Sequence, residues 1–301
     1  MTAPSSANRS LAKAFLNAAC GNAASARDAL ATAGFELEEV QPSEMEACLR
    51  KAIDGGAKRI LVAGGDGTIA TAAALVARTQ IELAILPGGT LNHFAKDHGI
   101  PTDLGDAALV AGSGNTIGAD IGYVGDRIFL NTSSIGAYVT FVRVRERFEK
   151  RFGYTLASFL ALVRMFSSLR AFSVELEVEG TKKSYRTSMV FIGVGERELQ
   201  MPTLGSRKVN GKRGLHVMIV EGRKPARLFA IALAGIARGT RQAARLPQFE
   251  SFIVDRCRVD LHRPSTTVAV DGELTGMDTP LDYRIERDAL RLVVPPPKAD
   301  E

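Results

Sequence analysis

The sequence predicts an α/β N-terminal domain with a parallel sheet over residues 1–120. A β-rich C-terminal domain over residues 121–301 follows, with an antiparallel β-sandwich-like fold and helical insertions. In the first part, short apolar runs alternate with helical patterns, which is typical of a parallel sheet. In the second part, apolar and polar residues alternate with a period of two between turn residues, which is typical of antiparallel strands. The pattern changes near residue 120.

The expected elements of the first part follow each other in strand–helix order. We expect helices over 26–33, 43–55 and 69–77, and strands over 36–40, 60–64 and 81–86. Ser43 and Glu46 have the spacing of a capping box, and Gly55-Gly56 ends the helix that they begin. After residue 86 a Gly-Gly-Thr turn leads into a short helix.

The expected elements of the second part are mostly short strands. Two helical stretches interrupt them, a basic one continuing into an apolar one over 143–166, and a second over 228–244. Both are expected to pack on the sheet by their apolar faces, and the same faces remain candidates for membrane contact. The predicted strands cover residues 173–178, 187–194, 215–220, 256–261, 266–270, 281–285 and 290–294.

The glycine-rich segment Gly64-Gly65-Asp66-Gly67-Thr68 connects an apolar strand to a helix. This order directs backbone N–H groups and a helix N-terminus at one place, which suits a phosphate. The Asp66 carboxylate would repel phosphate oxygens unless a divalent cation lay between them. An ordinary βα turn explains the same residues, since glycine and aspartate are frequent there.

A second glycine turn, Pro87-Gly88-Gly89-Thr90, follows the next strand. Consecutive parallel strands place their carboxyl ends at one edge of the sheet, where ligands bind. Neither turn has the spacing of a Walker A motif or of G-x-G-x-x-G. A nucleotide site here is therefore built differently from both.

Charge and composition restrict the class of protein. Residues 1–120 contain 9 Lys and Arg against 13 Asp and Glu, whereas residues 121–301 contain 29 against 20. A basic second part suits an anionic membrane surface, where each nearby cation contributes about 1 kcal/mol. A solvated basic face without a partner is the alternative. No nucleic-acid-binding motif occurs and Trp is absent, so we expect no nucleic acid partner.

The compartment is predicted from cysteines and apolar runs. The three cysteines are widely spaced, which predicts neither disulfides nor a zinc site. The first nine residues contain no apolar signal segment, and the apolar run Leu228–Ala237 is shorter than the ~20 residues that span a bilayer. We therefore expect a soluble cytoplasmic protein with peripheral contact at the inner membrane face.

With these motifs the chain resembles the diacylglycerol kinase catalytic domain family. Within it, the chain is similar to the bacterial soluble lipid kinases, which are related to sphingosine and ceramide kinases and more distantly to NAD kinases. The resemblance covers nearly the whole chain and implies a diacylglycerol kinase-like fold. The motifs that carry it are Gly64–Thr68, Pro87–Ala95, Ile117–Gly122, Ile128–Asn131 and Val268–Glu273.

The resemblance implies an ATP- and Mg²⁺-dependent lipid kinase with a role in phospholipid metabolism. Asp271 would accept the proton of a lipid hydroxyl, although Asp-Gly between apolar strands is also a typical hairpin turn. Glu273 would assist at the nucleotide or at a metal-bound water. Asp66 and Asp120 would lie near magnesium, and for Asp120 an ordinary loop aspartate is the alternative. The residues implied to bind nucleotide are Asn17, Gly64, Gly65, Asp66, Gly67, Thr68, Gly89, Thr90 and Asn92.

Three departures from the family pattern keep alternatives open. His93 occupies a position where many members have Asp, and Ala70 and Thr71 stand where Asn and Glu are frequent. The segment 210–216 is basic where members have an acidic structural magnesium site, so we expect no metal there. The alternatives are an NAD kinase, or a catalytically weak nucleotide- or lipid-binding protein. The lipid and the oligomeric state are not predicted.

Overall fold

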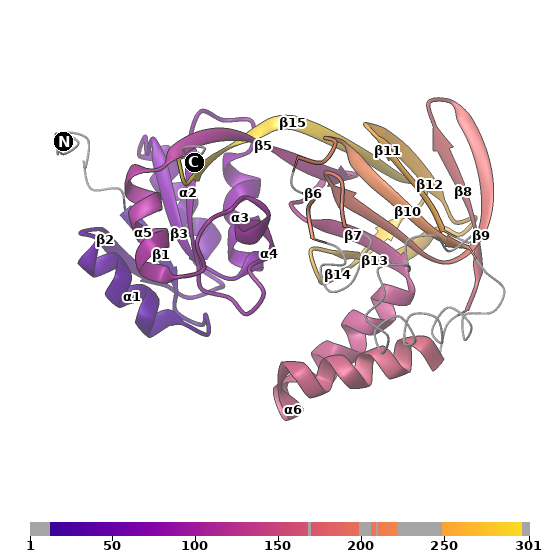
Figure 1. Ribbon diagram of the computed structural model, residues 1–301, viewed down its shortest axis with the longest axis horizontal. Coiled ribbons are helices and arrows are strands. Elements are labelled where there is room, and N and C mark those ends of the chain that lie inside the picture. The colour runs from indigo at the N-terminus through magenta and orange to yellow at the C-terminus, as the bar shows by residue number, and fades with distance from the viewer. Residues whose placement is uncertain (1–12, 168–169, 199–205, 209, 222–248, 297–301) are drawn as a thin grey trace. The chain divides into compact units, whose positions relative to one another are not determined.

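The computed structural model describes residues 13–167, 170–198, 206–208, 210–221 and 249–296 (Figure 1). The chain divides into two compact units, one reaching Ile121 and resuming at Arg287, the other comprising Gly122–Glu286. Both passages between the units lie inside long strands, β5 (Asn115–Val124) and β15 (Leu281–Val294). The C-terminal half of β15 therefore belongs to the same unit as the N-terminal elements.

A parallel sheet forms the centre of the first unit, as predicted. Its strands pair in the order β2–β1–β3–β4, and β15 adds a further parallel strand beside β4. The inner strands β3 and β4 are buried along nearly their whole length, because helices cover both faces of the sheet. The four N-terminal strands are β1 (Lys13–Asn17), β2 (Glu36–Val40), β3 (Arg59–Gly64) and β4 (Glu82–Pro87).

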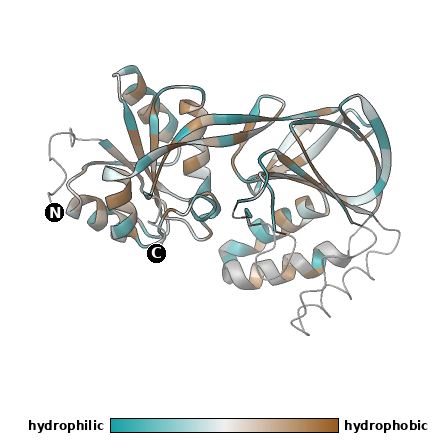
Figure 2. Ribbon diagram, turned by 45° about the horizontal axis from the view of Figure 1, so that its top comes forward, coloured by the Kyte–Doolittle hydropathy of each residue, from teal (hydrophilic) through white to brown (hydrophobic). Residues whose placement is uncertain are grey.

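Helices lie on both faces of this sheet (Figure 1). The first and the fifth contact each other on one face, and the second and third contact each other on the opposite face, as right-handed crossovers require. Hydrophobic and hydrophilic residues both occur along the helical ribbons (Figure 2). The helices are α1 (Ala23–Thr32), α2 (Met45–Asp54), α3 (Asp66–Val76), the short α4 (His93–Asp97) and α5 (Leu104–Ser113).

The predicted capping box at the start of α2 is wrong. The helix begins at Met45, and no side chain caps its first turn. A backbone turn takes the place of the cap, since the N–H of Glu44 donates to the carbonyl of Gln41 at 2.9 Å. Glu46 pairs instead with Arg50 one turn later, at 2.7 Å. The predicted end is confirmed, because the helix stops before Gly55.

The second unit is built from antiparallel strands, as predicted. They pair in the order β14–β13–β7–β9–β8–β12–β15, and β10 joins β9 to β11. The strands not yet bounded are β6 (Arg127–Phe129), β7 (Thr132–Gly136), β8 (Phe172–Val178), β9 (Thr181–Val194), β10 (Leu215–Glu221), β11 (Phe249–Val254), β12 (Arg256–Asp260), β13 (Ser265–Val270) and β14 (Glu273–Asp278).

The long helix α6 (Ala137–Ser167) contains the predicted helical stretch 143–166 and is interrupted at Gly153, whose φ is 74°. Its first turns pack Val139 and Val142 against Ala269 of β13. The other predicted helix, 228–244, lies outside the described residues. In the part of the chain that the structure describes, no helix is both long enough and apolar enough to cross a bilayer.

The separate strands predicted over 281–285 and 290–294 are one continuous strand, β15. Its alternating pattern is lost at Glu286, Arg287 and Asp288, where the strand passes from one unit to the other. Asp288 has a φ of 54°. A period-two pattern follows burial on one face, so it disappears where burial changes although the strand continues.

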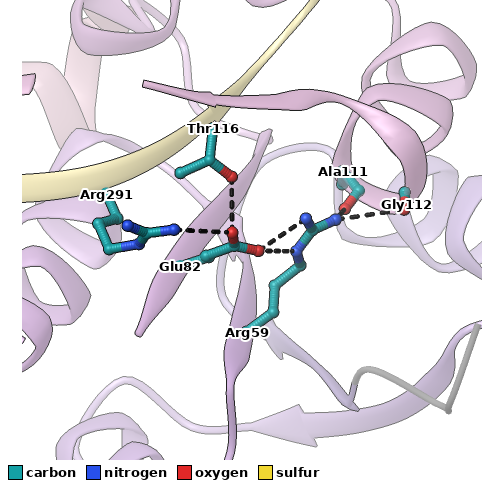
Figure 3. Close-up of polar contacts among 6 residues, drawn as sticks. All are labelled: Arg59, Glu82, Ala111, Gly112, Thr116 and Arg291. Atoms are coloured by element: carbon teal, nitrogen blue, oxygen red, sulfur yellow. Dashed lines mark hydrogen bonds and ion pairs between the residues drawn. The ribbon is translucent and has the colours of Figure 1, made fainter. Parts of the chain in front are cut away.

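One carboxylate joins the amino ends of the strands in the first unit (Figure 3). Glu82, at the start of β4, accepts from Arg59 of β3 at 2.7 Å, from the Thr116 hydroxyl at 2.8 Å and from Arg291 of β15 at 3.4 Å. Arg59 also donates to the carbonyl of Ala111 at 2.9 Å. Burial opposes the charge of Glu82, but the bonds from Thr116 and the arginines outweigh it, so its pKa lies below the ordinary value.

Glu82→Gln is expected to lower the free energy of unfolding by about 1–3 kcal/mol at neutral pH, since it removes hydrogen bonds to a charged group. Because the folded-state pKa of Glu82 is lowered, its contribution is complete above the ordinary carboxyl pKa of 4.5 and is lost as pH falls through the folded value. Urea unfolding at pH 7, 5 and 3.5 measures the difference.

The exposed Glu36→Gln on β2 serves as the control and is expected to change stability by less than about 0.5 kcal/mol. A difference between wild type and Glu82→Gln that stayed constant down to pH 3.5 would contradict the assignment of a stabilising charge to Glu82.

Candidate functional site

The first glycine loop connects β3 to α3 and is held by the end of β1. The helix begins after Gly65, which offers no side-chain cap, so the first N–H groups of α3 have no partner within the helix. The Asn17 amide donates to the Thr68 hydroxyl at 2.8 Å, while its carbonyl accepts the N–H of Ala19 at 2.9 Å. Asn17 and Thr68 therefore fix the first turn of α3 against β1.

Gly64 makes room for this arrangement. A Cβ atom at Gly64 would lie 2.6 Å from the Thr68 hydroxyl oxygen, which is too close for any side chain. Thr68 itself is only 9% exposed. Its side chain therefore supports the loop from within, and its backbone N–H is the group that remains to face a phosphate.

The second glycine loop is shaped by the side chain of Asn92. Its carbonyl oxygen accepts the N–H of Gly89 at 2.9 Å, and its amide donates to the carbonyl of Gly89 at 2.8 Å. Asn92 has a φ of 52° and a ψ of 47°, a left-handed conformation that asparagine tolerates better than most residues. The side chain of Asn92 therefore supports this loop through bonds to its backbone.

The two loops are in direct contact. A Cβ at Gly89 would lie 2.6 Å from the Cα of Gly65, and the N–H of Gly88 donates to the carbonyl of Gly64 at 2.9 Å. A Cβ at Gly65 would lie 3.4 Å from the Cα of Gly89, which is an ordinary contact. The close approach therefore requires glycine at position 89.

The Asp66 carboxylate caps the helix of the opposite loop. Its two oxygens accept the N–H groups of His93 and Phe94, both at 3.2 Å, at the start of α4. A carboxylate at a helix N-terminus satisfies N–H groups that have no partner within the helix. Asp66 thus has a structural role that the sequence did not predict, and it holds the two loops as one unit.

The predicted nucleotide residues fall into two groups. Thr68 and Asn92 are buried, and Asn17, partly buried, bonds Thr68. Gly67 and Thr90 are exposed at the surface of the two loops. The fold brings all the predicted residues of both loops together at the carboxyl edge of the parallel sheet. Their role in nucleotide binding stays a prediction.

Asp120 lies in β5, where it is 2% exposed and accepts the N–H of Asp288 at 3.1 Å. Arg291, which follows Asp288 in β15, pairs with Glu82 of β4. Asp120 thus holds the backbone of β15 in the first unit. Its place beside magnesium together with Asp66 stays a prediction.

The predicted magnesium site at the first glycine loop contains the carboxylate of Asp66. Among the described residues, no group of three or more His, Cys, Asp or Glu side chains could hold a metal ion. Magnesium is nevertheless bound in many phosphate-transfer sites by one or two carboxylates, with water and substrate phosphates completing its shell. Asp66 fits that pattern, and the contribution of Asp120 stays a prediction.

Asp271 occupies a hairpin turn, and its carboxylate is also bound. Asp271 and Gly272 have φ values of 46° and 87°, as a two-residue turn between β13 and β14 requires. The carboxylate accepts three successive backbone N–H groups, those of Leu130 at 2.7 Å, Asn131 at 2.8 Å and Thr132 at 2.9 Å. The hairpin interpretation is right, and the role of Asp271 as a base stays a prediction.

Glu273 lies at the start of β14 with its side chain 62% exposed. It forms an ion pair with Arg127 of β6 at 2.8 Å. An exposed pair of this kind contributes little to stability, about 0–1 kcal/mol. Its predicted assisting role is not supported by any further contact of this side chain in the described residues.

The basic segment after residue 209 is held by Glu196. The Glu196 carboxylate accepts the ammonium group of Lys208 at 3.0 Å and the N–H of Lys212 at 2.9 Å. The N–H of Lys212, followed by Lys208, lowers the pKa of Glu196. A lysine thus compensates the negative charge in this segment, and its residues do not fit a divalent cation.

Sequence reasoning missed the binding partners of Asp271. The segment Ile128–Asn131 was recognised as a shared motif, but without a role. The structure shows that its backbone, rather than its side chains, bonds Asp271. Sequence reasoning also missed Arg197, which is 3% exposed and donates to the carbonyl of Asn131. No sequence signal distinguishes it from a surface arginine.

The comparisons with known proteins agree with this architecture. Residues 13–124 match the diacylglycerol kinase catalytic domain. A solved structure described as a diacylglycerol kinase from Bacillus anthracis covers 94% of this chain and 96% of its own, with a TM-score of 0.66 at 18% identity. A second structure from that organism gives a TM-score of 0.71 at 19% identity over the same shares. These structures show the fold.

The relatives found by sequence are named as probable lipid kinases. The "Probable lipid kinase YegS-like" of Pseudomonas putida is 36% identical over 160 residues, which is 52% of each chain. The protein of that name from Pseudomonas syringae pv. tomato is 34% identical over 180 residues, 56% of this chain and 57% of the relative. The chain thus spans about half the length of these curated relatives. The similarity to the diacylglycerol kinase catalytic domain extends over residues 13–124.

Gly89→Ala is expected to lower the free energy of unfolding by about 1–3 kcal/mol, the range for inserting an atom into a packed site. The new Cβ would lie 2.6 Å from backbone Cα of Gly65, so the two loops have to separate. Urea unfolding measures the loss. Gly21→Ala is the matched control, because a Cβ there meets nothing within 4 Å. Equal stability of the two variants would show that the loop contact is not tight.

Proposed function

We propose that this protein is an ATP-dependent lipid kinase. It transfers the γ-phosphoryl group of ATP to the hydroxyl of a diacylglycerol-like or sphingoid lipid. The observation that carries the proposal is the pair of interlocked glycine loops at the carboxyl edge of the sheet, within a domain of the diacylglycerol kinase family. Backbone N–H groups at such an edge bind phosphate without specialised side chains.

In this proposal the nucleotide phosphates lie against the exposed backbone of the two loops. Gly65 and Gly67 present N–H groups without a Cβ, and Thr90 presents its hydroxyl from the second loop. Asn17, Thr68 and Asn92 act indirectly, because their side chains bond the loops themselves. The contact between the loops keeps both sets of donors fixed relative to each other, so binding does not have to order them.

Asp66 is the residue that would hold magnesium at this place. When bound, the ion neutralises the charge of the phosphate oxygens during transfer. Asp66 meanwhile keeps its bonds to the N–H groups of His93 and Phe94, which fix the direction of its carboxylate. Asp120 is the second predicted magnesium residue, and its carboxylate also accepts the N–H of Asp288.

Asp271 is the proposed base that accepts the proton of the lipid hydroxyl. Three N–H donors stabilise its anionic form and fix its orientation, which makes it a weak but well-positioned base. A weak base suffices, since phosphoryl transfer passes through a loose transition state in which positioning and charge neutralisation dominate.

The second candidate function is a nucleotide- or lipid-binding protein with little catalytic activity. The observation that favours it is the same set of bonds at Asp271, because a carboxylate that holds a hairpin to a neighbouring segment has a sufficient structural reason to be present. An NAD kinase is the third alternative. The lipid kinase names of the relatives favour the first proposal.

The test is transfer of γ-labelled phosphate from Mg-ATP by the purified chain. Diacylglycerol and sphingosine in mixed micelles, and NAD in solution, serve as acceptors. Label is expected in a lipid and not in NAD. Asp271→Asn is expected to lower kcat by about 10²–10⁴-fold, the usual contribution of an acid–base group. Asp278→Asn, an exposed aspartate of the same hairpin, is the control.

The other possible results of this assay distinguish the alternative functions. Nucleotide binding without transfer to either lipid would overturn the kinase proposal in favour of the binding protein. Label in NAD would identify an NAD kinase. If a folded Asp271→Asn variant kept the wild-type rate, Asp271 would not be the base, and its bonds to the backbone would be its whole role.

A lipid substrate requires contact with a membrane, and α6 carries a suitable surface. Leu156, Leu160 and Val163 recur at intervals of four and three on one face, with exposures of 48%, 36% and 49%. The small residues Ala157 and Ala161 are fully buried instead. Three large apolar side chains exposed on one helix face mark a contact surface.

Charge indicates what this surface contacts. Residues 137–167 contain six Lys and Arg and two Glu. A second copy of so basic a helix would be repelled, whereas anionic lipids would attract it. We therefore assign the face of Leu156, Leu160 and Val163 to peripheral contact with an anionic membrane, with the protein located in the cytoplasm at the inner face.

The triple variant Leu156→Gln, Leu160→Gln, Val163→Gln is expected to bind phosphatidylglycerol-containing vesicles at least tenfold more weakly, since it removes apolar area from the bilayer. Flotation with the vesicles measures binding. Leu109→Gln on α5, which replaces a leucine with 60% exposure, is the control. Unchanged binding of the triple variant, or equal binding to phosphatidylcholine vesicles, would contradict the assignment.

A further inference from the structure

A buried arginine lies behind the segment that binds Asp271. Arg197 follows β9 and is 3% exposed, which is rare for a residue whose charge is costly to bury. Its Nη2 atom donates to the carbonyl of Asn131 at 3.0 Å and to the carbonyl of Val194 at 2.7 Å. The guanidinium is thus directed at the backbone of the segment whose N–H groups hold Asp271.

The peptide group between Asn131 and Thr132 connects the two charges. Its carbonyl accepts Arg197, and its N–H donates to Oδ1 of Asp271 at 2.9 Å. Both hydrogen bonds belong to one peptide group, so Nη2 of Arg197 and Oδ1 of Asp271 lie within about 8.5 Å. A cation at the carbonyl end of a peptide polarises its N–H and makes it a stronger donor to an anion.

The position of Arg197 is fixed on both sides. A Cβ at Gly193 would lie 2.6 Å from Cγ of Arg197, so the aliphatic part of the side chain rests directly on the glycine of β9. The N–H of Arg197 donates to Nδ1 of His216 at 2.8 Å, and Nε2 of His216 lies 2.6 Å from the Ser251 hydroxyl. These contacts leave the guanidinium little freedom.

The histidine supports the same arrangement. Burial lowers the pKa of His216, which is 3% exposed, so the ring is neutral at pH 7. Since Nδ1 accepts the N–H of Arg197, the proton lies on Nε2 and donates to Ser251. A neutral ring is required here, because a doubly protonated one could not accept that bond.

The carbonyl of Asn131 does not need the arginine for hydrogen bonding alone. The N–H of Val194 already donates to it at 3.0 Å. A neutral side chain could therefore occupy this position without leaving that carbonyl unpaired. What the guanidinium adds is its charge, placed behind the peptide group that holds Asp271.

We propose that Arg197 is a positioning residue that orients the Asp271 carboxylate and stabilises its anionic form through the Asn131–Thr132 peptide group. The kinetic consequence rests on the proposed kinase function, whereas the structural one does not. Two other arginines lie near the hairpin of Asp271. Arg127 forms an ion pair with Glu273, and a Cβ at Gly272 would lie 3.9 Å from Nη2 of Arg145.

The structural test uses hydrogen exchange of the Thr132 amide in the full chain, followed by NMR. Arg197→Gln, which keeps donors but removes the charge, is expected to speed exchange at least tenfold at Thr132. Arg197→Lys, which keeps the charge, is expected to exchange within about threefold of wild type. Arg258→Met, at an exposed arginine of β12, is the control for general loosening. Equal exchange in Arg197→Gln and wild type would overturn the proposal.

The kinetic test separates positioning from folding. Arg197→Gln is expected to lower kcat at least tenfold with KM for ATP within twofold of wild type, and Arg197→Lys is expected to recover most of the rate. Equal losses in the Lys and Gln variants would show that charge is not the property used and would overturn the proposal. If no variant and no wild-type protein transferred phosphate, the kinase proposal would fail, and the exchange result would still decide the role of Arg197.

Discussion

The close approach of two glycine loops is the constraint on which the first unit depends. Gly89 meets Gly65 with no space for a Cβ on Gly89, and Asp66 caps α4 across the same contact. The loops follow neighbouring parallel strands, so the register of β3 and β4 brings them into contact. The N–H groups that they present are therefore held by packing before any ligand binds, which is the preorganisation that phosphate binding favours.

The opposite edge of the same sheet has a different function. There Glu82 collects Arg59, Thr116 and Arg291, and so attaches β15 to the N-terminal strands. Asp120 also holds the backbone of β15, through the N–H of Asp288. The carboxyl edge of the sheet thus carries the candidate chemistry, and the amino edge carries the connections of the chain.

In the second unit a single carboxylate combines structure and proposed chemistry. Asp271 belongs to a hairpin turn, binds three N–H groups of a neighbouring segment and is backed by Arg197 through a peptide group. Glu196 pairs with Lys208 beside the adjoining segment. The bonds that fix the turn at Asp271 also orient its carboxylate, so they are compatible with both a structural and a catalytic role.

The sequence by itself determined the elements whose signal is local. Apolar runs of strand length, the turns after Gly64 and Pro87, and the change to a period of two near residue 120 all predicted their structures, because burial and turn chemistry act on neighbouring residues. The glycine at the end of α2 was predicted for the same reason. Its start was not, since a backbone turn at Gln41 competed with the side-chain cap.

Which of the predicted site residues meet depends on the tertiary structure. Thr68 and Asn92 support the loops from inside, Asp120 bonds the backbone of β15, and Arg197 lies behind the segment that binds Asp271. These outcomes depend on strand register and on contacts between residues far apart in the chain. A carboxylate has the same sequence signal whether it caps a helix, binds a backbone or accepts a proton, so its partners alone distinguish these roles.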